Sequence, residues 1–357
     1  MTAFINSVAC AVPPYERQRD FLESLPHWAG TPEVVDKLAK IAASARIEER
    51  HTVLEQPFGL NGAEGFYRPG SFPSTGERMK VYQREAPGLA MAAVEKLRVE
   101  GTELDHVTHL IVTSCTGFYA PGLDIDILRA ARLSPRVQRT LIGFMGCHAA
   151  LIGLRTARDI VRADENAVVL MVNLELCSLH LQQTERMDRL VSFLLFADGC
   201  AASLISSQAR GLRIDGCASH LSLRDSERMA WHVEDSGFAM TLDARLPLRI
   251  RQWFETSSEL SSTSTDRGSM CWAIHPGGRL ILDGVQDACG LTDEQMHLSR
   301  EVLRRFGNMS SASVMFALGQ IMNGRASLPA PKPGRAIAFG PGLTVEIMDF
   351  TVIPATA

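Results

Sequence analysis

Residues 141–154 read LIGFMGCHAALIGL, a short apolar run that meets glycines and a cysteine before an Ala/Leu-rich segment begins. The apolar spacing predicts a strand over 141–144, then a helix that opens at Cys147 and continues to about position 161. Gly143 and Gly146 permit a tight turn between them. Because the start of a helix favours an anion, a thiol there is predicted to ionise readily and to act as a nucleophile. The alternative is an ordinary buried cysteine.

The composition is that of a globular enzyme with a large core. The chain has 357 residues, of which 46% are hydrophobic and 21% charged, enough for one large domain or two packed halves. A net charge of −4 gives no basic footprint, so no nucleic-acid partner is expected. Residues 1–12 lack the basic region of a signal peptide. The most apolar later stretch, 190–206, is interrupted by Asp198, so no membrane span is expected.

Cysteine usage indicates a reducing compartment. The eight cysteines are widely scattered and include no C-x-x-C pair. That pattern disfavours both a disulfide framework and a metal site of the zinc type, and it favours a cytoplasmic protein.

Alternating strand and helix patterns predict α/β layers. Strands are expected at 4–10, 109–113, 141–144, 168–172, 271–274, 337–339 and 343–352, with a turn and strand over 196–205. Helices are expected at 33–45, 87–99, 279–288 and 292–307, with a loop and helix from 121 to about 132. Residues 55–76 are expected to form a long surface loop, and the polar stretch 255–270 a loop or frayed helix. The pattern restarts after about residue 210.

Three polar side chains follow such strands or helices at turns, namely Cys147, His275 and Asn308. Thioester chemistry needs a thiolate, a neighbour that stabilises it, and donors aimed at a developing oxyanion. His275 ends an apolar strand and precedes Pro-Gly-Gly, so its imidazole is expected at the rim of a site. Each residue also has an ordinary explanation as a buried cysteine, a core histidine or a helix-capping asparagine. Their co-occurrence, each with glycine within two residues, favours a catalytic site.

The chain resembles the type III polyketide synthases, the chalcone and stilbene synthase-like family of thiolase-fold condensing enzymes, and resembles the bacterial branch more than the plant one. The matching stretches span most of the chain in family order. They are CTGFYAPG (115–122), FMGC (144–147), LFADG (195–199), IHPGG (274–278), GNMSS (307–311) and FGPGLTVE (339–346).

This resemblance implies a fold and an assembly. The expected architecture is a five-layered αβαβα thiolase-like fold with two pseudo-duplicated halves. Residues 1–210 would form the N-terminal half carrying the nucleophilic cysteine, and residues 211–357 the C-terminal half carrying the catalytic histidine and asparagine. A homodimer is implied. The substrates would be acyl-CoA and malonyl-CoA, and no metal and no tightly bound cofactor would be needed, because the leaving carboxylate supplies the nucleophile.

The resemblance also implies an acyltransferase mechanism. Cys147 would hold an acyl group from a CoA thioester. His275 and Asn308 would bind the malonyl-CoA carbonyl and stabilise the enolate formed as carbon dioxide leaves. Repeated Claisen condensation and cyclisation would give pyrones or resorcinol- or phloroglucinol-type rings.

Further roles follow from the same resemblance. Phe196 aligns with the family's gatekeeper, and Lys37 and Lys40 with its CoA-phosphate contacts, whereas the third cation falls on Ser44. The remaining aligned gate or cavity positions are Met240, Trp231, Cys115, Thr116, Cys177, His180, Ser310, Gly340, Pro341 and Gly342.

Substitutions at the cavity positions bear on the starter. Cys177 and His180 replace smaller hydroxyl residues, which disfavours a plant-like aromatic starter. Ala120, with Met240 and Cys177, is compatible with a tunnel for an aliphatic acyl chain. The bulky Trp231 favours a shorter chain.

Three other functions remain open at this point. One is a ketoacyl-acyl carrier protein synthase III-like enzyme that performs a single condensation. Another is a thioester hydrolase that uses the same Cys-His-Asn set. The last is an acyl-binding protein without catalytic activity.

Overall fold

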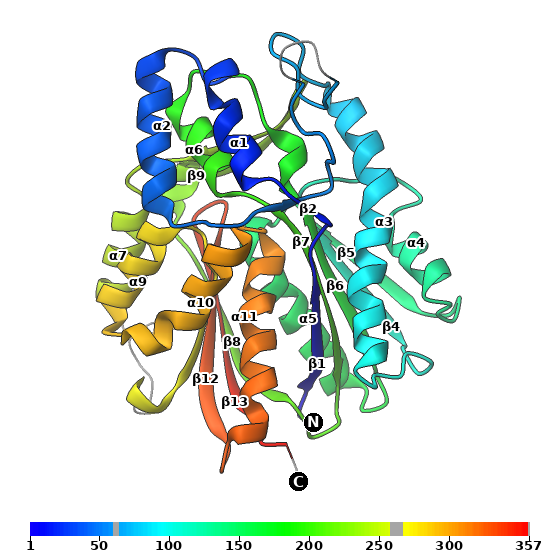
Figure 1. The fold of residues 1–357 in the computed structure, drawn as a ribbon. Helices are drawn as coiled ribbons and strands as arrows, with labels where there is room; N and C mark the ends of the chain where they lie inside the picture. The colour runs from blue at the N-terminus through cyan, green and yellow to red at the C-terminus, as the bar shows by residue number, and fades with distance from the viewer. Residues whose placement is uncertain (60–63, 258–266, 356–357) are drawn as a thin grey trace.

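A mixed nine-stranded sheet organises the computed structural model, which describes residues 1–59, 64–257 and 267–355 (Figure 1). Its strands, in chain order, are β1 (Phe4–Ala11), β4 (His109–Ser114), β5 (Gln138–Gly143), β6 (Val169–Leu176), β7 (Asp198–Ser206), β8 (Leu212–Leu221), β11 (Cys271–Ile274), β12 (Lys332–Gly340) and β13 (Thr344–Val352). Two small pairs stand apart, formed by β2 (Tyr15–Glu16) with β3 (His51–Thr52) and by β9 (Met229–Glu234) with β10 (Gly237–Leu242).

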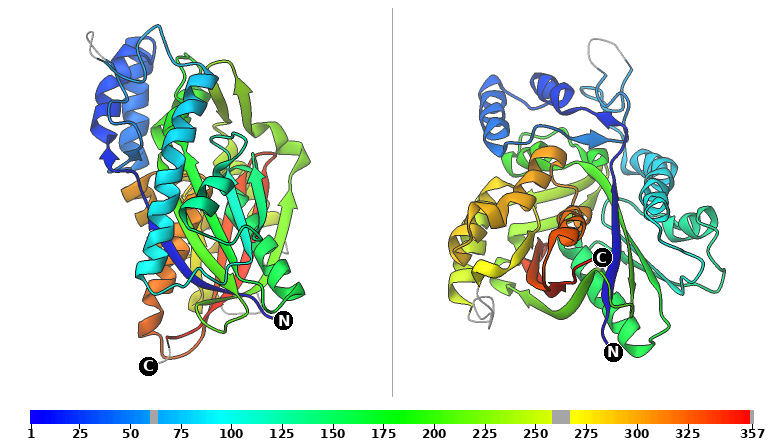
Figure 2. Two further views of the ribbon diagram at one scale, coloured as in Figure 1. Left: turned by 90° about the vertical axis from the view of Figure 1, so that its right-hand side faces the viewer. Right: turned by 60° about the horizontal axis from the view of Figure 1, so that its bottom comes forward.

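Helices cover both faces of this sheet. The α-helices are α1 (Gln18–Ser24), α2 (Pro32–Ala45), α3 (Thr75–Val99), α4 (Leu123–Ala130), α5 (Ala149–Ala163), α6 (Met187–Leu195), α7 (Leu246–Thr256), α9 (Arg279–Cys289), α10 (Asp293–Phe306) and α11 (Ser311–Asn323). Short 3-10 helices cover Leu25–His27, Gly146–His148, Cys177–His180, Leu223–Arg228, Arg267–Ser269 and Gly324–Ser327. Helices α1 and α2 lie at one end of the sheet, and both chain termini lie at the opposite end (Figure 2).

Strand order reveals two related halves. The sheet runs β11-β12-β13-β8-β1-β7-β6-β4-β5 and is joined in the middle by the antiparallel pair of β8 with β1. In one half β4 and β6 are parallel, and β6, β7 and β1 then pair antiparallel. In the other half β11 and β12 are parallel, and β12, β13 and β8 then pair antiparallel. The same unit therefore occurs twice, as the prediction of two pseudo-duplicated halves requires. The proposed division after residue 210 falls between β7 and β8.

Alternating side chains divide the core into layers, because successive residues of a strand point to opposite faces. In β4, Leu110 and Val112 pack with α3 on one face, while Ile111 faces α5 and α11 on the other. In β12, Ile337 and Phe339 pack with α7 and α9. Helices α5 and α11 thus lie between the two halves of the sheet, and α3 and α9 lie outside them. This arrangement is the predicted αβαβα order.

Most predicted elements are present, but the helix expected over 87–99 begins at Thr75. Ser74 caps it in a capping box with Glu77, and Pro87 lies inside the helix. An interior proline costs a helix roughly 3 kcal/mol. The cap and the burial of the helix against the sheet outweigh that cost, so the helix begins well before the predicted start at Pro87. Of the loop expected over 55–76, residues 60–63 lie outside the described residues, and the described remainder ends at the cap of α3.

Helix α11 was not predicted, because it is apolar on nearly all sides and shows no helical period of polar and apolar residues. Strands of both halves cover it.

The expected loop or frayed helix over 255–270 lies partly outside the described residues, since 258–266 are not among them. Within the described ranges, α7 extends to Thr256, and no helix is both long and apolar enough to cross a membrane.

Candidate active site

Cys147 is placed by the turn between β5 and α5. Gly146 has a φ of +76°, and a Cβ added there would lie 2.3 Å from Cδ of Pro341, so only glycine allows the two halves to approach here. Cys147 lies in the 3-10 helix that follows the turn, and the regular α-helix begins only at Ala149. The predicted strand–turn–helix is confirmed, but Cys147 precedes the α-helix by a short 3-10 turn.

His275 and Asn308 come from the C-terminal half. His275 directly follows β11, and its backbone N–H donates to Ile337 O at 2.7 Å. Asn308 lies between α10 and α11, where Oδ1 accepts from the N–H of Ser310 at 2.9 Å. Its Nδ2 donates to Gly277 O at a longer 3.4 Å. The carboxamide is therefore oriented by its own loop, with a weakly engaged NH2 group.

The structure brings the three predicted residues together. Cys147, His275 and Asn308 line one cavity of about 20 Å3. Its other lining residues are Phe196, Met229, Met240, Leu242, Gly277, Ile281 and Phe339. A thiol from one half thus shares a small apolar chamber with an imidazole and a carboxamide from the other.

His275 is not at the rim, as its sequence context suggested, but is 1% exposed. The N–H of Gly277 donates to His275 O at 2.8 Å, and a Cβ on Gly277 would lie 3.4 Å from the imidazole Cδ2. The Pro-Gly-Gly segment therefore folds back over the ring and closes it off from solvent. The prediction that the His275 imidazole lies at the rim was wrong, because the turn after a strand can cover the side chain at the end of that strand.

Burial sets the electrostatics of the site. Burial raises the pKa of the Cys147 thiol to about 12, while hydrogen bonds from Ser310 and Asn308 oppose that rise. Burial also lowers the pKa of His275 to about 3, and the neighbouring His148 lowers it further. The prediction that the Cys147 thiol ionises readily is therefore wrong for the site without substrate. The cost of burying a lone thiolate outweighs the stabilisation that the start of the helix gives to an anion. A charge fits here only as a thiolate and imidazolium formed together.

Both ring nitrogens of His275 are buried and without a hydrogen-bond partner among the described residues. Buried polar groups of folded proteins nearly always have such a partner. A neutral imidazole carries one N–H donor. Beside the weakly engaged NH2 of Asn308, this donor provides the elements of a pocket for a carbonyl or enolate oxygen. His148 has the same unpartnered nitrogens, but it does not line the cavity.

A second pocket of about 20 Å3 continues from Cys147 and holds most of the aligned cavity positions. It is lined by Cys115, Thr116, Gly146, Cys147, Cys177, Ser192, Phe193, Phe196, Trp231, Met240, Ser310 and Pro341. His180, Gly340 and Gly342 do not line either pocket. Lys37 and Lys40 lie on the exposed side of α2.

Glu175, which the sequence did not suggest as a site residue, is a fully buried carboxylate at the end of β6. It accepts hydrogen bonds from Thr116 Oγ1 at 2.8 Å and Ser311 Oγ at 2.6 Å, and from the Cys115 N–H and Sγ. Cys115 Sγ lies 3.3 Å from Ser310 Oγ. Burial raises the pKa of Glu175. A charged residue next to the end of a mostly apolar strand was the available signal.

The described residues contain no cluster of three or more His, Cys, Asp or Glu side chains arranged to hold a metal ion.

Two domain matches cover most of the chain. Residues 19–209 match the N-terminal domain of the chalcone and stilbene synthases, and residues 217–354 match the C-terminal domain. The chain therefore belongs to the chalcone and stilbene synthase family, the type III polyketide synthases, as its sequence motifs predicted.

Curated relatives agree with this assignment. The α-pyrone synthesis polyketide synthase-like protein Pks18 of Mycobacterium tuberculosis is 33% identical over 291 residues, which cover 78% of this chain and 73% of Pks18. Probable polyketide synthase 1 of Dictyostelium discoideum is 29% identical over 328 residues, 88% of this chain. The chain spans only 10% of that much longer protein.

Solved structures have the same fold. The C-terminal type III polyketide synthase domain of Steely1 from Dictyostelium has a TM-score of 0.90 and 26% identity, covering 99% of this chain and 100% of that one. PKS-I from the brown alga Ectocarpus siliculosus has a TM-score of 0.89 and 28% identity, covering 99% and 98%. These similarities confirm the thiolase-like fold and favour a polyketide synthase over the single-condensation and hydrolase alternatives.

Proposed function

We propose that this protein condenses an acyl-CoA starter with malonyl-CoA in repeated decarboxylative Claisen reactions and releases a cyclised polyketide. The observation that carries this proposal is the shared chamber of Cys147, His275 and Asn308, in which the buried imidazole has no hydrogen-bond partner among the residues that the structure describes.

In the first step Cys147 takes the acyl group. Its Sγ attacks the thioester carbonyl while its proton moves to His275, so that charge appears only as a pair. The carbon–sulfur bond to CoA breaks, and the departing CoA thiolate takes the proton. The acyl group remains as a thioester on Cys147.

In the second step malonyl-CoA supplies the carbon nucleophile. Its thioester oxygen accepts hydrogen bonds from the neutral imidazole of His275 and the carboxamide of Asn308. The bond to the carboxylate breaks, carbon dioxide leaves, and the electron pair of that bond forms the enolate, which attacks the acyl carbon on Cys147. The carbon–sulfur bond to Cys147 then breaks, and the Cys147 thiolate takes a proton from water. The extended chain is now a thioester of CoA and can be loaded onto Cys147 again. Each oxyanion donor is worth roughly 10²–10³ in rate.

Substrate handling follows from the surroundings of the site. We propose that Lys37 and Lys40 bind CoA phosphates and that Phe196, which lines both pockets around Cys147, acts as the gate. The leaving carboxylate supplies the nucleophile, so the reaction needs no tightly bound cofactor. The name of Pks18 refers to α-pyrone synthesis, which supports a pyrone as the product ahead of a resorcinol- or phloroglucinol-type ring.

The edge strand β5 supports a homodimer. Within the described part of the chain no strand pairs with its outer edge, and apolar side chains in and beside it are exposed: Phe118, Leu141, Phe144 and Met145. An exposed apolar edge of this kind marks an interaction surface. We propose that a second copy covers it. The eight cysteines are widely scattered along the chain and include no C-x-x-C pair, which supports a cytoplasmic location.

The test is product analysis by mass spectrometry with malonyl-CoA, a panel of acyl-CoA starters and no carrier protein. We expect carbon dioxide release and products with two or more malonyl-derived units. Cys147→Ala should abolish these products, whereas Cys10→Ala, a cysteine outside both pockets, should not. Strict dependence on a carrier protein, or release of the free starter acid alone, would contradict the proposal.

A further inference from the structure

We infer that His148 is a positioning residue for the reaction and accepts a hydrogen bond from His275 once that imidazole has taken the proton of Cys147. The inference rests on the proposed function, because it needs the transfer of that proton to His275. It adds a fixed partner for the imidazolium on the side of the ring that faces away from the thiol.

His148 lies in the same 3-10 helix as Cys147 and is held against the other half of the chain. It is 2% exposed. A Cβ added to Gly340 would lie 1.7 Å from its Nδ1, so the ring rests on the backbone of Gly340. One residue before Cys147, Gly146 lies in the same way against Pro341. Two close contacts therefore flank the thiol and fix the place of the His148 ring.

The sheet brings His148 and His275 to one face. Strands β11 and β12 run parallel, and the backbone N–H of His275 continues their hydrogen bonding. Ala273 and Ala338 point to the core that α5 and α11 share. Because side chains alternate along a strand, His275 and Gly340, each two residues further along, face the same side. The ring that rests on Gly340 thus lies beside the His275 imidazole.

Both ring nitrogens of His148 are buried and have no hydrogen-bond partner among the residues that the structure describes, and the same holds for His275. Two neighbouring rings in this state are exceptional, because buried polar groups are nearly always paired. A neutral imidazole has one N–H donor and one acceptor nitrogen, whereas an imidazolium has two donors. Charging His275 gives it a second N–H. Since Gly340 fills the space beside Nδ1 of His148, Nε2 is the nitrogen that accepts it.

The surroundings of His148 keep it neutral, as an acceptor must be. Burial, followed by the Arg155 cation on α5, lowers the pKa of His148 to about 4. Arg155 donates in turn to Glu346 of β13 at 2.8 Å. Helix α11 and residues 336–340 of β12, which also pack on this turn, carry no charged side chain. After burial, a charge on His148 is the cause that lowers the pKa of His275, so the two rings hold one proton between them.

A neutral acceptor in this place supports the ion pair of the first step. When the proton moves from Cys147 Sγ to His275, a thiolate and an imidazolium form in a buried chamber. A hydrogen bond to His148 orients the imidazolium, as the third member of a catalytic triad orients the base. One hydrogen bond to an ion is worth about tenfold in an equilibrium constant. His148 should therefore lower the apparent pKa of Cys147 by about one pH unit.

The experiment follows alkylation of Cys147 by iodoacetamide against pH, with the labelled peptide identified by mass spectrometry. His148→Phe keeps a ring against Gly340 but has no acceptor. We expect its labelling at pH 7 to slow about tenfold and to approach the wild-type rate as pH rises. His148→Gln offers an amide oxygen and should recover part of the loss. His109→Phe, the control, replaces a half-buried histidine at the other end of the sheet strands and should keep the wild-type profile.

Two outcomes would overturn the inference. In one, His148→Phe keeps the wild-type pH profile. In the other, its labelling slows by the same factor at every pH, as expected of a variant that only loosens the turn. In both cases the proposed function stands, provided that wild type forms condensation products. If wild type forms no condensation product from malonyl-CoA with any starter, it is the proposed function that fails.

Discussion

Phe196 and Asn308 form a parallel β-bridge that joins the two halves of the chain inside the active site. The N–H of Asn308 donates to Leu195 O at 2.8 Å, and the N–H of Ala197 donates to Asn308 O at 2.9 Å. The proposed gate residue and the proposed oxyanion donor are thus held by one pair of backbone hydrogen bonds. Any change that opens this bridge should affect both.

Gly307→Ala tests the bridge. Gly307 has a φ of +67°, and a Cβ there would lie 2.9 Å from Leu195 O and 3.2 Å from Arg50 Cγ. A strained backbone of this kind costs about 1–3 kcal/mol. We expect lower thermal stability and, as Asn308 moves, at least tenfold slower malonyl-CoA decarboxylation. Gly76→Ala is the control, because its Cβ meets nothing within 4 Å and it lies in the first turn of α3. Equal behaviour of the two variants would contradict the role given to the bridge.

Asn308→Asp removes the NH2 donor and retains the shape of the side chain. We expect malonyl-CoA decarboxylation to fall by roughly 10²–10³, as for loss of one oxyanion donor. The rate at which the starter acylates Cys147, measured by intact-protein mass spectrometry, should fall less. Asn166→Asp, at an exposed position, is the control. If the variant decarboxylates malonyl-CoA at the wild-type rate, Asn308 is not a donor of the oxyanion pocket.

The pH dependence of Cys147 alkylation tests the pairing with His275. Burial, which outweighs the hydrogen bonds from Ser310 and Asn308, raises the pKa of the Cys147 thiol to about 12. A proton can leave it at neutral pH only if His275 accepts it. In His275→Gln that acceptor is lost, so iodoacetamide labelling at pH 7 should slow at least tenfold and should keep rising with pH through the alkaline range. Identical pH profiles for wild type and variant would show that the imidazole does not take the proton.

Asp198 should make stability depend on pH. It is fully buried, and burial raises its pKa from 3.8 to about 6 even though Val53 N–H and Ser178 donate to it. The folded state then binds a proton that the unfolded state has already released, so this contribution to stability is full below pH 3.8 and is lost as pH rises to about 6. A shift of about two units corresponds to on the order of 3 kcal/mol.

The measurement is urea unfolding of wild type and Asp198→Asn across that range. Relative to the variant, wild type should lose on the order of 3 kcal/mol between pH 4 and 7, and the difference should be constant above pH 7. A difference that does not change with pH would mean that Asp198 titrates normally.

The edge of β5 predicts how the oligomer can be broken. Leu141 is half-exposed on this strand, and Phe144 follows the strand in the turn to Cys147. We expect Leu141→Asp to shift the protein from dimer to monomer in sedimentation analysis. Val99→Asp, which places the same charge on another highly exposed apolar residue, should leave it dimeric. A wild-type protein that sediments as a monomer would refute the proposed interface.

The sequence by itself determined the local chemistry of this protein. The glycines around Cys147 and the Pro-Gly-Gly after His275 are local signals, and each is followed by the turn that the structure shows. The helix expected over 292–307 likewise begins where Thr292 caps α10. The same motifs predicted the family. These features depend on neighbouring residues alone, so a linear pattern is sufficient to identify them.

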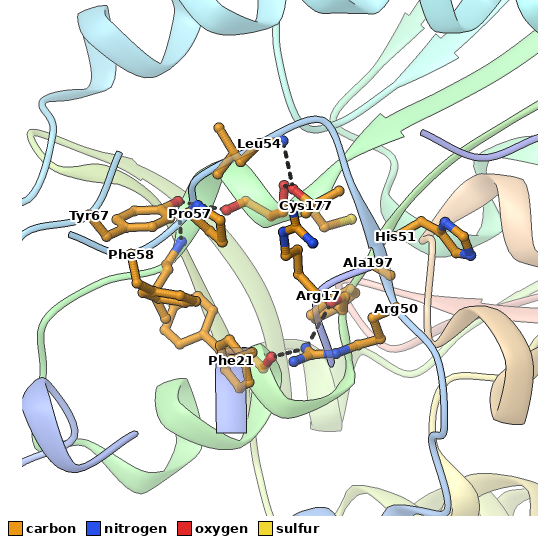
Figure 3. A pocket seen from close by; sticks show the side chains of 15 residues that line it. Arg17, Phe21, Arg50, His51, Leu54, Pro57, Phe58, Tyr67, Cys177 and Ala197 are labelled. Atoms are coloured by element: carbon orange, nitrogen blue, oxygen red, sulfur yellow. Dashed lines mark hydrogen bonds between the residues drawn. The ribbon is translucent and has the colours of Figure 1, made fainter. Parts of the chain in front are cut away.

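Only the tertiary structure decided how those groups are surrounded. Gly146 lies against Pro341, and His275 is closed off from solvent, because distant strands pair in one register. The hydrogen bonds around Glu175 and the pocket that Cys177, Phe21 and Phe58 line arise from the same long-range packing (Figure 3). Burial there reverses the ionisation expected of the thiol, since desolvation depends on everything that encloses a group and not on its sequence neighbours.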